Sequence, residues 1–178
     1  MYSDLKPGGT FLLNTEWNEE ELNELMPAKM KKYFAENNIK FYTINGTHIA
    51  KEIGLGNRVN SVLQAAFFKL ANIIPIDEAV NYMKEAIKKS YGKKGENVLN
   101  MNFEAVDKGV DGAVKFEIPA EWADAQEKET VSKKEVPAFI KDIVFPINAQ
   151  KGDMLPVSSF KGREDGTFPQ GTAAYEKR

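Results

Sequence analysis

A strand followed by two helices is expected within residues 39–70, and this segment constrains the fold more than any other part of the chain. Residues 39–44 form a short β-branched and aromatic run, which is typical of a strand inside a sheet. Asn45 is a suitable N-cap for a helix over residues 47–53. Apolar residues then recur at helical spacing over residues 59–70 and predict a longer helix. A strand that runs into a helix is half of an α/β unit, so we expect an α/β fold.

The turn after this strand carries the first candidate binding residues. Ligands of open α/β sheets bind beyond the carboxyl ends of the strands, where Asn45, Thr47 and His48 are expected. His48 is the only histidine, and its ordinary pKa suits proton transfer near neutral pH. No serine is identifiably paired with it, so a catalytic triad cannot be assembled from the sequence. A hydrogen-bonding, structural His48 is the favoured alternative.

The elements on either side of this segment predict a small, mostly parallel sheet. Residues 10–14 read as a buried strand, and two helical segments separated by Pro27 lie between it and the strand at residues 39–44. This order predicts a parallel βαβ unit. Helices are also expected from Pro75 to residue 89 and over residues 96–108, followed by a strand at residues 113–118. We therefore predict an incomplete three-layer α/β/α domain over residues 1–118.

The composition changes near Pro119. Residues 119–135 are rich in charge and predict a linker. Residues 136–178 contain prolines and glycines that oppose regular structure, yet they hold too many apolar side chains for a disordered tail. We expect an extended, irregular arm whose apolar side chains are buried against another domain. The residues assigned to this interface are Phe145, Ile147, Leu155, Phe160, Phe168 and Tyr175.

Two further motifs allow a functional and a structural interpretation. Gly54 and Gly56 precede a helix, but a dinucleotide fingerprint needs a third glycine and a strand before it, so a helix-joining turn is favoured. Arg58 could bind an anion at the start of the next helix, with a capping or surface role as the alternative.

Charge clusters and composition limit the chemistry further. The acidic run at residues 19–21 fits a solvated helix front better than a metal site. Lys88, Lys89, Lys93 and Lys94 fit a solvated helix end, or a site for an anionic ligand such as a phosphate group. The chain has no cysteine, which excludes thiolate nucleophiles and cysteine-ligated iron–sulfur clusters. The net charge of −2 gives no argument for nucleic acid or a membrane, and a cytoplasmic protein is expected.

Several stretches resemble a known family. FPINAQKGD (residues 145–153), LPVS (155–158), EDGTFP (164–169) and GTAAYEKR (171–178) resemble the linking segment of pyruvate:ferredoxin (flavodoxin) oxidoreductases, which is named after its closing Glu-Lys-Arg. In the core, LKPGGT (5–10), IGLGNRVN (53–60), FFKL (67–70) and SYGKKG (90–95) resemble the gamma-type domain of the same enzymes. The resemblance covers nearly the whole chain.

The resemblance implies a module of an enzyme that decarboxylates pyruvate oxidatively to acetyl-CoA and CO₂. The complete enzyme is implied to use thiamine diphosphate, Mg²⁺, [4Fe–4S] clusters and coenzyme A, with ferredoxin or flavodoxin as electron acceptor. The chain matches the C-terminal part of the gamma-type domain (residues 1–118) and the linking segment (residues 136–178). We expect the first half of that domain ahead of this chain and the cofactor-binding domains elsewhere.

No family ligand of thiamine or of a cluster maps onto a residue of this chain, so we expect no catalytic residue, no metal ligand and no bound cofactor. Its expected partners are the other domains of the same polypeptide, and the resemblance leaves a homo-oligomer open. The alternative is a binding module that helps coenzyme A or substrate to reach the active site. Its candidate residues are Asn45, Thr47, His48, Lys93 and Lys94.

Overall fold

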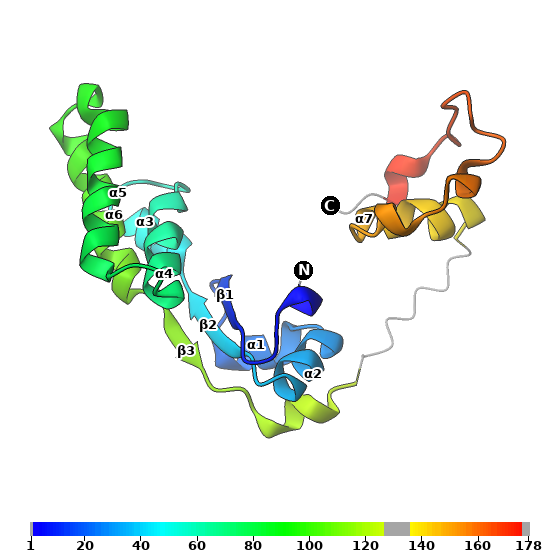
Figure 1. Ribbon diagram of the computed structural model, residues 1–178, viewed down its shortest axis with the longest axis horizontal. Coiled ribbons are helices and arrows are strands. Elements are labelled where there is room, and N and C mark those ends of the chain that lie inside the picture. The colour runs from blue at the N-terminus through cyan, green and yellow to red at the C-terminus, as the bar shows by residue number, and fades with distance from the viewer. Residues whose placement is uncertain (1, 127–135, 176–178) are drawn as a thin grey trace. The chain divides into compact units, whose positions relative to one another are not determined.

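The structure is a computed structural model that describes residues 2–126 and 136–175. It divides into two units, Met1–Lys128 and Glu129–Arg178, and each is described by itself below. Figure 1 shows that the first unit contains both strands and helices, whereas helical turns and irregular segments make up the described part of the second.

A three-stranded sheet forms the centre of the first unit. Its strands are β1 (Thr10–Asn14), β2 (Lys40–Ile44) and β3 (Val114–Phe116), in the order β1-β2-β3. β1 and β2 pair in parallel, with Phe11 opposite Phe41, which confirms the predicted parallel pair. β3 pairs antiparallel to β2, with Phe116 opposite Phe41, and is shorter than the expected strand at residues 113–118. The sheet is thus mixed but mostly parallel.

Two helices connect β1 to β2, as the sequence predicts. They are α1 (Glu19–Leu25) and α2 (Ala28–Glu36). Asn18 and Glu21 form a reciprocal capping box at the start of α1: each side chain accepts a hydrogen bond from the other residue's backbone N–H, both at 2.9 Å. Pro27 lies between the helices because its ring is tolerated at a helix start but not in a helix interior.

Four helices follow β2, and the second of them packs against β1 (Figure 1). They are α3 (Gly46–Glu52), α4 (Asn60–Ala71), α5 (Ile76–Tyr91) and α6 (Glu96–Asp111). α4 and α6 approach closely at Gly109, where an added Cβ would lie 2.5 Å from the backbone oxygen of Val62. α3, α4 and α6 bury a cluster with Ile44 of β2, and α4, α5 and α6 bury another around Met83. The predicted α/β architecture is confirmed.

An aromatic cluster packs α1 and α2 against the sheet. The rings of Phe34 and Phe41 lie 5.4 Å apart, those of Phe41 and Phe116 5.2 Å, and those of Phe116 and Trp122 5.3 Å in a stacked arrangement. Trp122 is only 2% exposed, and its indole N–H donates to Asn23 Oδ1 at 2.7 Å. The first unit therefore continues past residue 118 into the short 3-10 helix Ala120–Asp124.

The sequence interpretation placed that 3-10 helix in the charged linker at residues 119–135. Its charged residues are exposed, as in a linker, but Trp122 is buried. Because a buried indole removes a large apolar area from water, Trp122 attaches this segment to the first unit. Residues 127–135 of the expected linker, and the closing Glu-Lys-Arg, lie outside the described residues.

The second unit is more helical than the extended arm that we expected. A π-helical stretch, Ile140–Val144, runs directly into α7 (Phe145–Asn148), and Ile140 and Ile143 are buried. Pro137 does not oppose this helix because it precedes it, and its carbonyl accepts hydrogen bonds from Ile140 and Lys141. The remainder is irregular, with short 3-10 helices at Gly152–Met154, Val157–Phe160 and Thr172–Tyr175.

Candidate functional site

The turn between β2 and α3 is a helix start in which polar groups bind the backbone. Asn45 Oδ1 accepts a hydrogen bond from the N–H of His48 at 2.9 Å and so caps α3. The N–H of Gly46 donates to Asn14 Oδ1, also at 2.9 Å. Thr47 is half-buried beside these groups. The turn lies at the carboxyl end of a strand, as predicted, and Asn45 of the turn and Asn14 at the end of β1 both bind the start of α3.

His48 lies on the exposed surface of α3. Its Nε2 lies 3.3 Å from Glu52 Oε1, one helical turn along, and Lys108 of α6 lies 3.6 Å from the other carboxylate oxygen of Glu52. The His48 side chain is 64% exposed. An arrangement of this kind is a surface ion-pair network, and exposed pairs contribute little to stability.

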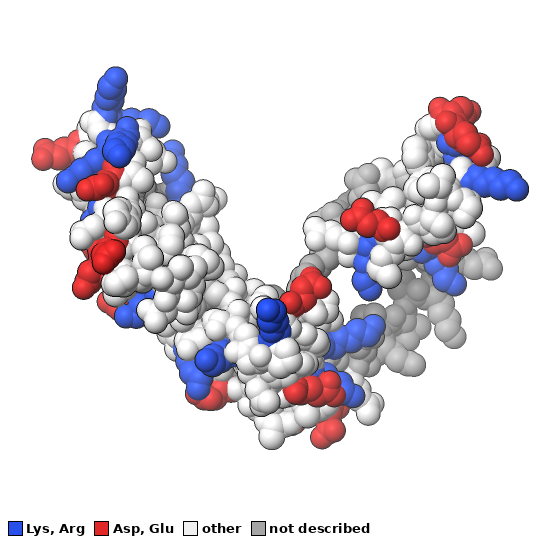
Figure 2. Space-filling view, viewed as in Figure 1, with Lys and Arg blue, Asp and Glu red and all other residues white. Residues whose placement is uncertain are grey.

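Lys93 and Lys94 lie in the 3-10 turn Gly92–Lys94 that joins α5 to α6, and both are exposed. The ammonium group of Lys94 lies 5.0 Å from the ring centre of Tyr91, a cation–π contact. Tyr91 also lines a polar pocket of about 230 Å³ between α4 and α5. Figure 2 shows Lys and Arg mixed with Asp and Glu around this end of α5 and α6. The two lysines therefore belong to a different place from the turn at Asn45.

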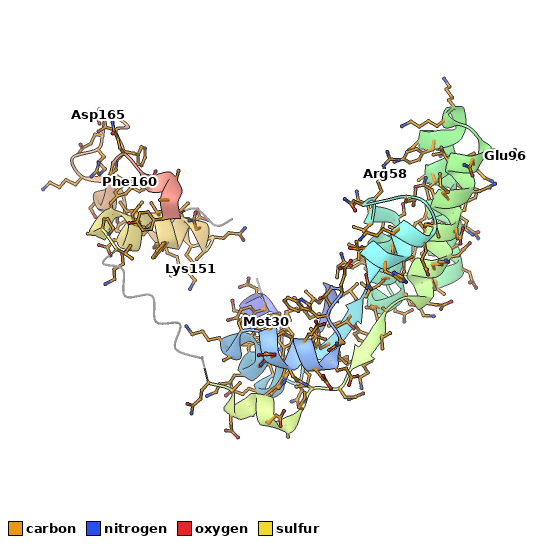
Figure 3. All side chains as sticks on the ribbon, turned by 180° about the vertical axis from the view of Figure 1, so that it is seen from behind. Met30, Arg58, Glu96, Lys151, Phe160 and Asp165 are labelled. Carbon is orange, nitrogen blue, oxygen red and sulfur yellow. The ribbon has the colours of Figure 1, made fainter. Side chains whose placement is uncertain are left out.

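The polar pocket brings in residues that the sequence analysis did not select. Its polar lining comes from the first two turns of α4 and the last turn of α5: Asn60, Ser61, Gln64, Ser90 and Tyr91. Figure 3 shows Arg58 on the connection that precedes α4, where its side chain is exposed. The run Asn-Arg-Val-Asn-Ser (residues 57–61) contains two polar residues of the pocket. The sequence does not show that α5 faces this run, because that contact depends on tertiary packing.

The turn that contains Gly54 and Gly56 joins α3 to α4, which is the interpretation favoured from the sequence. Gly54 and Gly56 have φ angles of 84° and 60°, which glycine adopts without strain. The N–H of Leu55 donates to the carbonyl of Ala50 at 2.8 Å and closes the end of α3. A helix precedes the two glycines, whereas a dinucleotide-binding turn follows a strand directly.

The acidic run at residues 19–21 serves the start of α1. Glu21 belongs to the capping box, and acidic side chains in a first turn interact favourably with the helix dipole. Within residues 2–126 and 136–175, no group of three or more His, Cys, Asp or Glu residues could hold a metal ion. In the same ranges, no helix is long and apolar enough to cross a membrane.

The six apolar residues assigned to a domain interface differ in exposure. Phe145, Ile147 and Phe168 are exposed by 42%, 47% and 58%, whereas Leu155, Phe160 and Tyr175 are half-buried. Phe168 packs edge-on against Phe139, with ring centres 5.6 Å apart. The guanidinium group of Arg163 lies 4.7 Å from the centre of the Phe139 ring. The second unit therefore buries part of its apolar surface within itself and leaves the rest accessible.

Two acidic side chains hold the loop at residues 162–167, which precedes the 3-10 helix Thr172–Tyr175. Hydrogen bonds from the side chain and backbone of Thr167 lower the pKa of Asp165, at 2.7 and 3.0 Å from its Oδ1. A hydrogen bond from the N–H of Gly162 lowers the pKa of Glu164. In the first unit, the bond from Lys115 to Glu117 at 2.6 Å raises the pKa of Lys115. All three groups support local turns or strand edges.

An apolar pocket of about 440 Å³ opens between β1 and α4. It is lined by Thr10, Leu12, Asn14, Leu63, Phe67, Leu70 and Ala71. Phe67 belongs to the apolar stripe predicted over residues 59–70, and its side chain is 53% exposed at this pocket.

Comparison with known proteins decides the family. A family model described as pyruvate ferredoxin/flavodoxin oxidoreductase matches residues 1–112, which is more than half of the chain. The chain belongs to the pyruvate ferredoxin/flavodoxin oxidoreductase family. A second model, named EKR and described as a domain of unknown function, matches residues 125–178.

Individual members of the family align over the whole chain. The chain is 53% identical to the pyruvate-flavodoxin oxidoreductase of Enterobacter agglomerans and 52% identical to the pyruvate:ferredoxin oxidoreductase of Moorella thermoacetica. It is 42% identical to a pyruvate dehydrogenase [NADP(+)] of Cryptosporidium parvum. The chain spans 15% of the length of the first two proteins and 10% of the third.

Proposed function

We propose that this chain is a structural module of a pyruvate:ferredoxin or pyruvate:flavodoxin oxidoreductase and that it is inactive by itself. The complete enzyme would convert pyruvate and coenzyme A to acetyl-CoA and CO₂ and pass electrons to ferredoxin or flavodoxin. The observation that carries this proposal is the 53% and 52% identity, over all 178 residues, to two proteins named for these activities.

The contacts of the candidate residues support a structural role. Asn45 caps α3, Asn14 holds Gly46, and His48 pairs with Glu52 on the surface. The two asparagine bonds hold a helix start, and the His48–Glu52 pair lies on the surface of the same helix. A catalytic base, in contrast, must reach the proton of a bound substrate. The most conspicuous polar residues at the strand end thus have structural partners.

The electron acceptor is expected to be selected outside this chain. Three relatives that align over the whole chain are named for flavodoxin, ferredoxin and NADP(+). The complete enzyme is proposed to use thiamine diphosphate, Mg²⁺, [4Fe–4S] clusters and coenzyme A. Cluster ligands would have to come from other domains because the chain has no cysteine. We further propose a cytoplasmic location and contacts of Phe145, Ile147 and Phe168 with neighbouring domains.

The polar pocket between α4 and α5 favours a second candidate function, a contribution to coenzyme A binding. Lys94 packs on Tyr91, which lines the pocket with Asn60 and Ser61. Ammonium groups and the N–H groups of a first helical turn both attract phosphate. Calorimetric titration with coenzyme A tests this. Heat that disappears when Lys93 and Lys94 are replaced by alanine, but not in the control Lys32→Ala, would favour the second function.

A hybrid enzyme tests the first proposal. The 178 residues replace the matching stretch of the Moorella thermoacetica protein, and pyruvate-dependent, coenzyme A-dependent reduction of ferredoxin is measured. We expect activity within about threefold of the parent enzyme. At 52% identity over the whole stretch, the substituted residues should pack against the neighbouring domains as the parent residues do. A folded hybrid with no turnover would contradict the proposal.

A further inference from the structure

Asn45 and Gly46 form a dipeptide that is chemically prone to deamidation. The backbone nitrogen of the residue after an asparagine can attack the side-chain amide, and glycine permits this attack most readily because it has no Cβ in the way. Asn45 is the only asparagine of the chain that precedes a glycine. Because Asn45 caps α3, the geometry of this pair decides whether the cap is chemically stable.

The reaction needs only water and hydroxide. The N–H of Gly46 gives its proton to hydroxide, and the nitrogen then bonds to Cγ of Asn45. The bond from Cγ to the amide nitrogen breaks, and this nitrogen takes a proton from water and leaves as ammonia. The product is a five-membered succinimide ring. Water adds to one of its two carbonyl carbons and opens the ring, which leaves aspartate or isoaspartate at position 45 without any oxidation or reduction.

The folded turn keeps the two reacting atoms apart. Asn45 has a ψ of 70°, at which its Cβ and the nitrogen of Gly46 lie on nearly opposite sides of the Cα–C bond. The succinimide ring has both atoms on the same side, so the backbone must first rotate by roughly half a turn. Gly46 is the first residue of α3, and this rotation would detach the helix start from the end of β2.

Hydrogen bonds hold both reacting groups in this unreactive arrangement. Asn45 Oδ1 accepts a hydrogen bond from the N–H of His48 at 2.9 Å, which fixes the amide group in the cap. The N–H of Gly46 donates to Asn14 Oδ1 at 2.9 Å, and Gly46 is buried, so hydroxide reaches this proton only when the turn opens. A hydrogen bond made by the neutral form of a group also disfavours its ionisation.

We propose that Asn45 is a deamidation site that the folded start of α3 keeps inactive, and that the hydrogen bond from Gly46 to Asn14 sets the rate of its modification. Local opening of the turn, and not unfolding of the whole unit, then admits the reaction. Aspartate at position 45 would keep an acceptor for the N–H of His48. Isoaspartate would add a methylene group to the main chain and move Gly46 away from Asn14, so α3 would lose its cap.

Incubation of the full chain in mildly alkaline buffer, followed by trypsin digestion and mass spectrometry, tests the inference. Trypsin releases residues 41–51, a peptide whose only side-chain amide is that of Asn45. An unincubated sample gives the zero point. The peptide should deamidate at least about tenfold faster in the chain unfolded by guanidinium chloride than in the folded chain, because unfolding removes both hydrogen bonds. Equal rates in the folded and unfolded chains would overturn the inference.

Matched variants test the part played by Asn14. Asn14→Ala should raise the deamidation rate of the folded chain about fivefold, which corresponds to about 1 kcal/mol for one hydrogen bond. Asn14→Asp keeps an acceptor and should stay within about twofold of the wild-type rate. Trp122→Phe removes a hydrogen bond of similar value, made to Asn23, and should leave the rate unchanged. Equal acceleration by Asn14→Ala and Trp122→Phe would show that global unfolding governs the reaction, which contradicts the inference.

Asn45→Ser tests whether the modification arises at Asn45. Serine keeps an oxygen that can cap α3 but has no amide to lose, so its peptide of residues 41–51 should keep its mass even after incubation of the unfolded chain. Deamidation in that peptide would contradict the assignment. Asn14 is exposed, so its variants should fold. If one does not, the folded and unfolded wild-type chains still decide whether the turn protects Asn45.

Discussion

Asn14, the last residue of β1, accepts a hydrogen bond at 2.9 Å from the backbone N–H of Gly46, the first residue of α3, across 32 positions of sequence. An added Cβ at Gly46 would lie 3.0 Å from the same oxygen, so the close approach leaves little room for a side chain. This bond attaches the end of β1 to the turn after β2, where the sequence predicts a binding site.

Replacing Asn14 tests the value of this bond. Asn14→Ala should lower the free energy of unfolding by about 1 kcal/mol, because it leaves the N–H of Gly46 without its acceptor. Asn14→Asp keeps the acceptor and should cost less. Urea unfolding followed by tryptophan fluorescence reports on the first unit, which contains both tryptophans. Equal losses in the two variants would show that the bond is not the cause.

The contact between α4 and α6 predicts an unfavourable glycine replacement. Gly109→Ala should destabilise by about 1–3 kcal/mol, despite the higher helix propensity of alanine, because the new methyl group would meet Val62 O at 2.5 Å. Gly92→Ala is the control, since Gly92 has a helical φ of −55° and open space around it. It should be neutral or slightly stabilising. Thermal unfolding followed by circular dichroism compares the two.

Trp122 should stabilise the first unit mainly through its buried ring. Trp122→Phe removes the 2.7 Å bond to Asn23 and should cost about 1 kcal/mol, whereas Trp122→Ala should cost about 3–5 kcal/mol because it opens a cavity beside Phe116. Chemical unfolding followed by circular dichroism measures both. A negligible loss for Trp122→Ala would mean that residues 119–126 do not belong to the first unit.

The lowered pKa of Asp165 predicts a pH response of its loop. Because the folded pKa lies below the ordinary value, the hydrogen bonds to Thr167 stabilise the loop above that value and are lost as the pH falls through the folded pKa. Thr167→Val removes the hydroxyl donor and should raise the pKa of Asp165, while the pKa of Glu164 stays lowered. Carboxyl-carbon NMR titration resolves both groups. An unchanged pKa of Asp165 would exclude the hydroxyl as its main cause.

Local signals were sufficient to predict the helices between residues 19 and 111 and the parallel strand pair. The Asn18 capping box, the break at Pro27 and the cap at Asn45 each depend on residues within four positions. The antiparallel pairing of β3 and the burial of Trp122 depend on Phe41, more than 70 positions away, and no local pattern encodes such a partner. The same limit applies to the second unit, where Phe139 and Phe168 pack together.

The candidate site was predicted in part. The position of Asn45 at a strand end and its capping of α3 follow from the sequence. Asn14, which binds the same turn from the end of β1, was not selected because its partner Gly46 is distant in sequence. Phe67 fits a helical apolar stripe and yet is exposed, because a stripe shows that a face is apolar and not what covers it.

The central claim, that these residues support an oxidoreductase without supplying its catalytic groups, is tested most directly by the turnover of the hybrid Moorella enzyme carrying His48→Ala. The account predicts a kcat for pyruvate oxidation within about twofold of the unsubstituted hybrid, because His48 is an exposed partner of Glu52. A loss of kcat on the order of a hundredfold, as the removal of a general base causes, would contradict it.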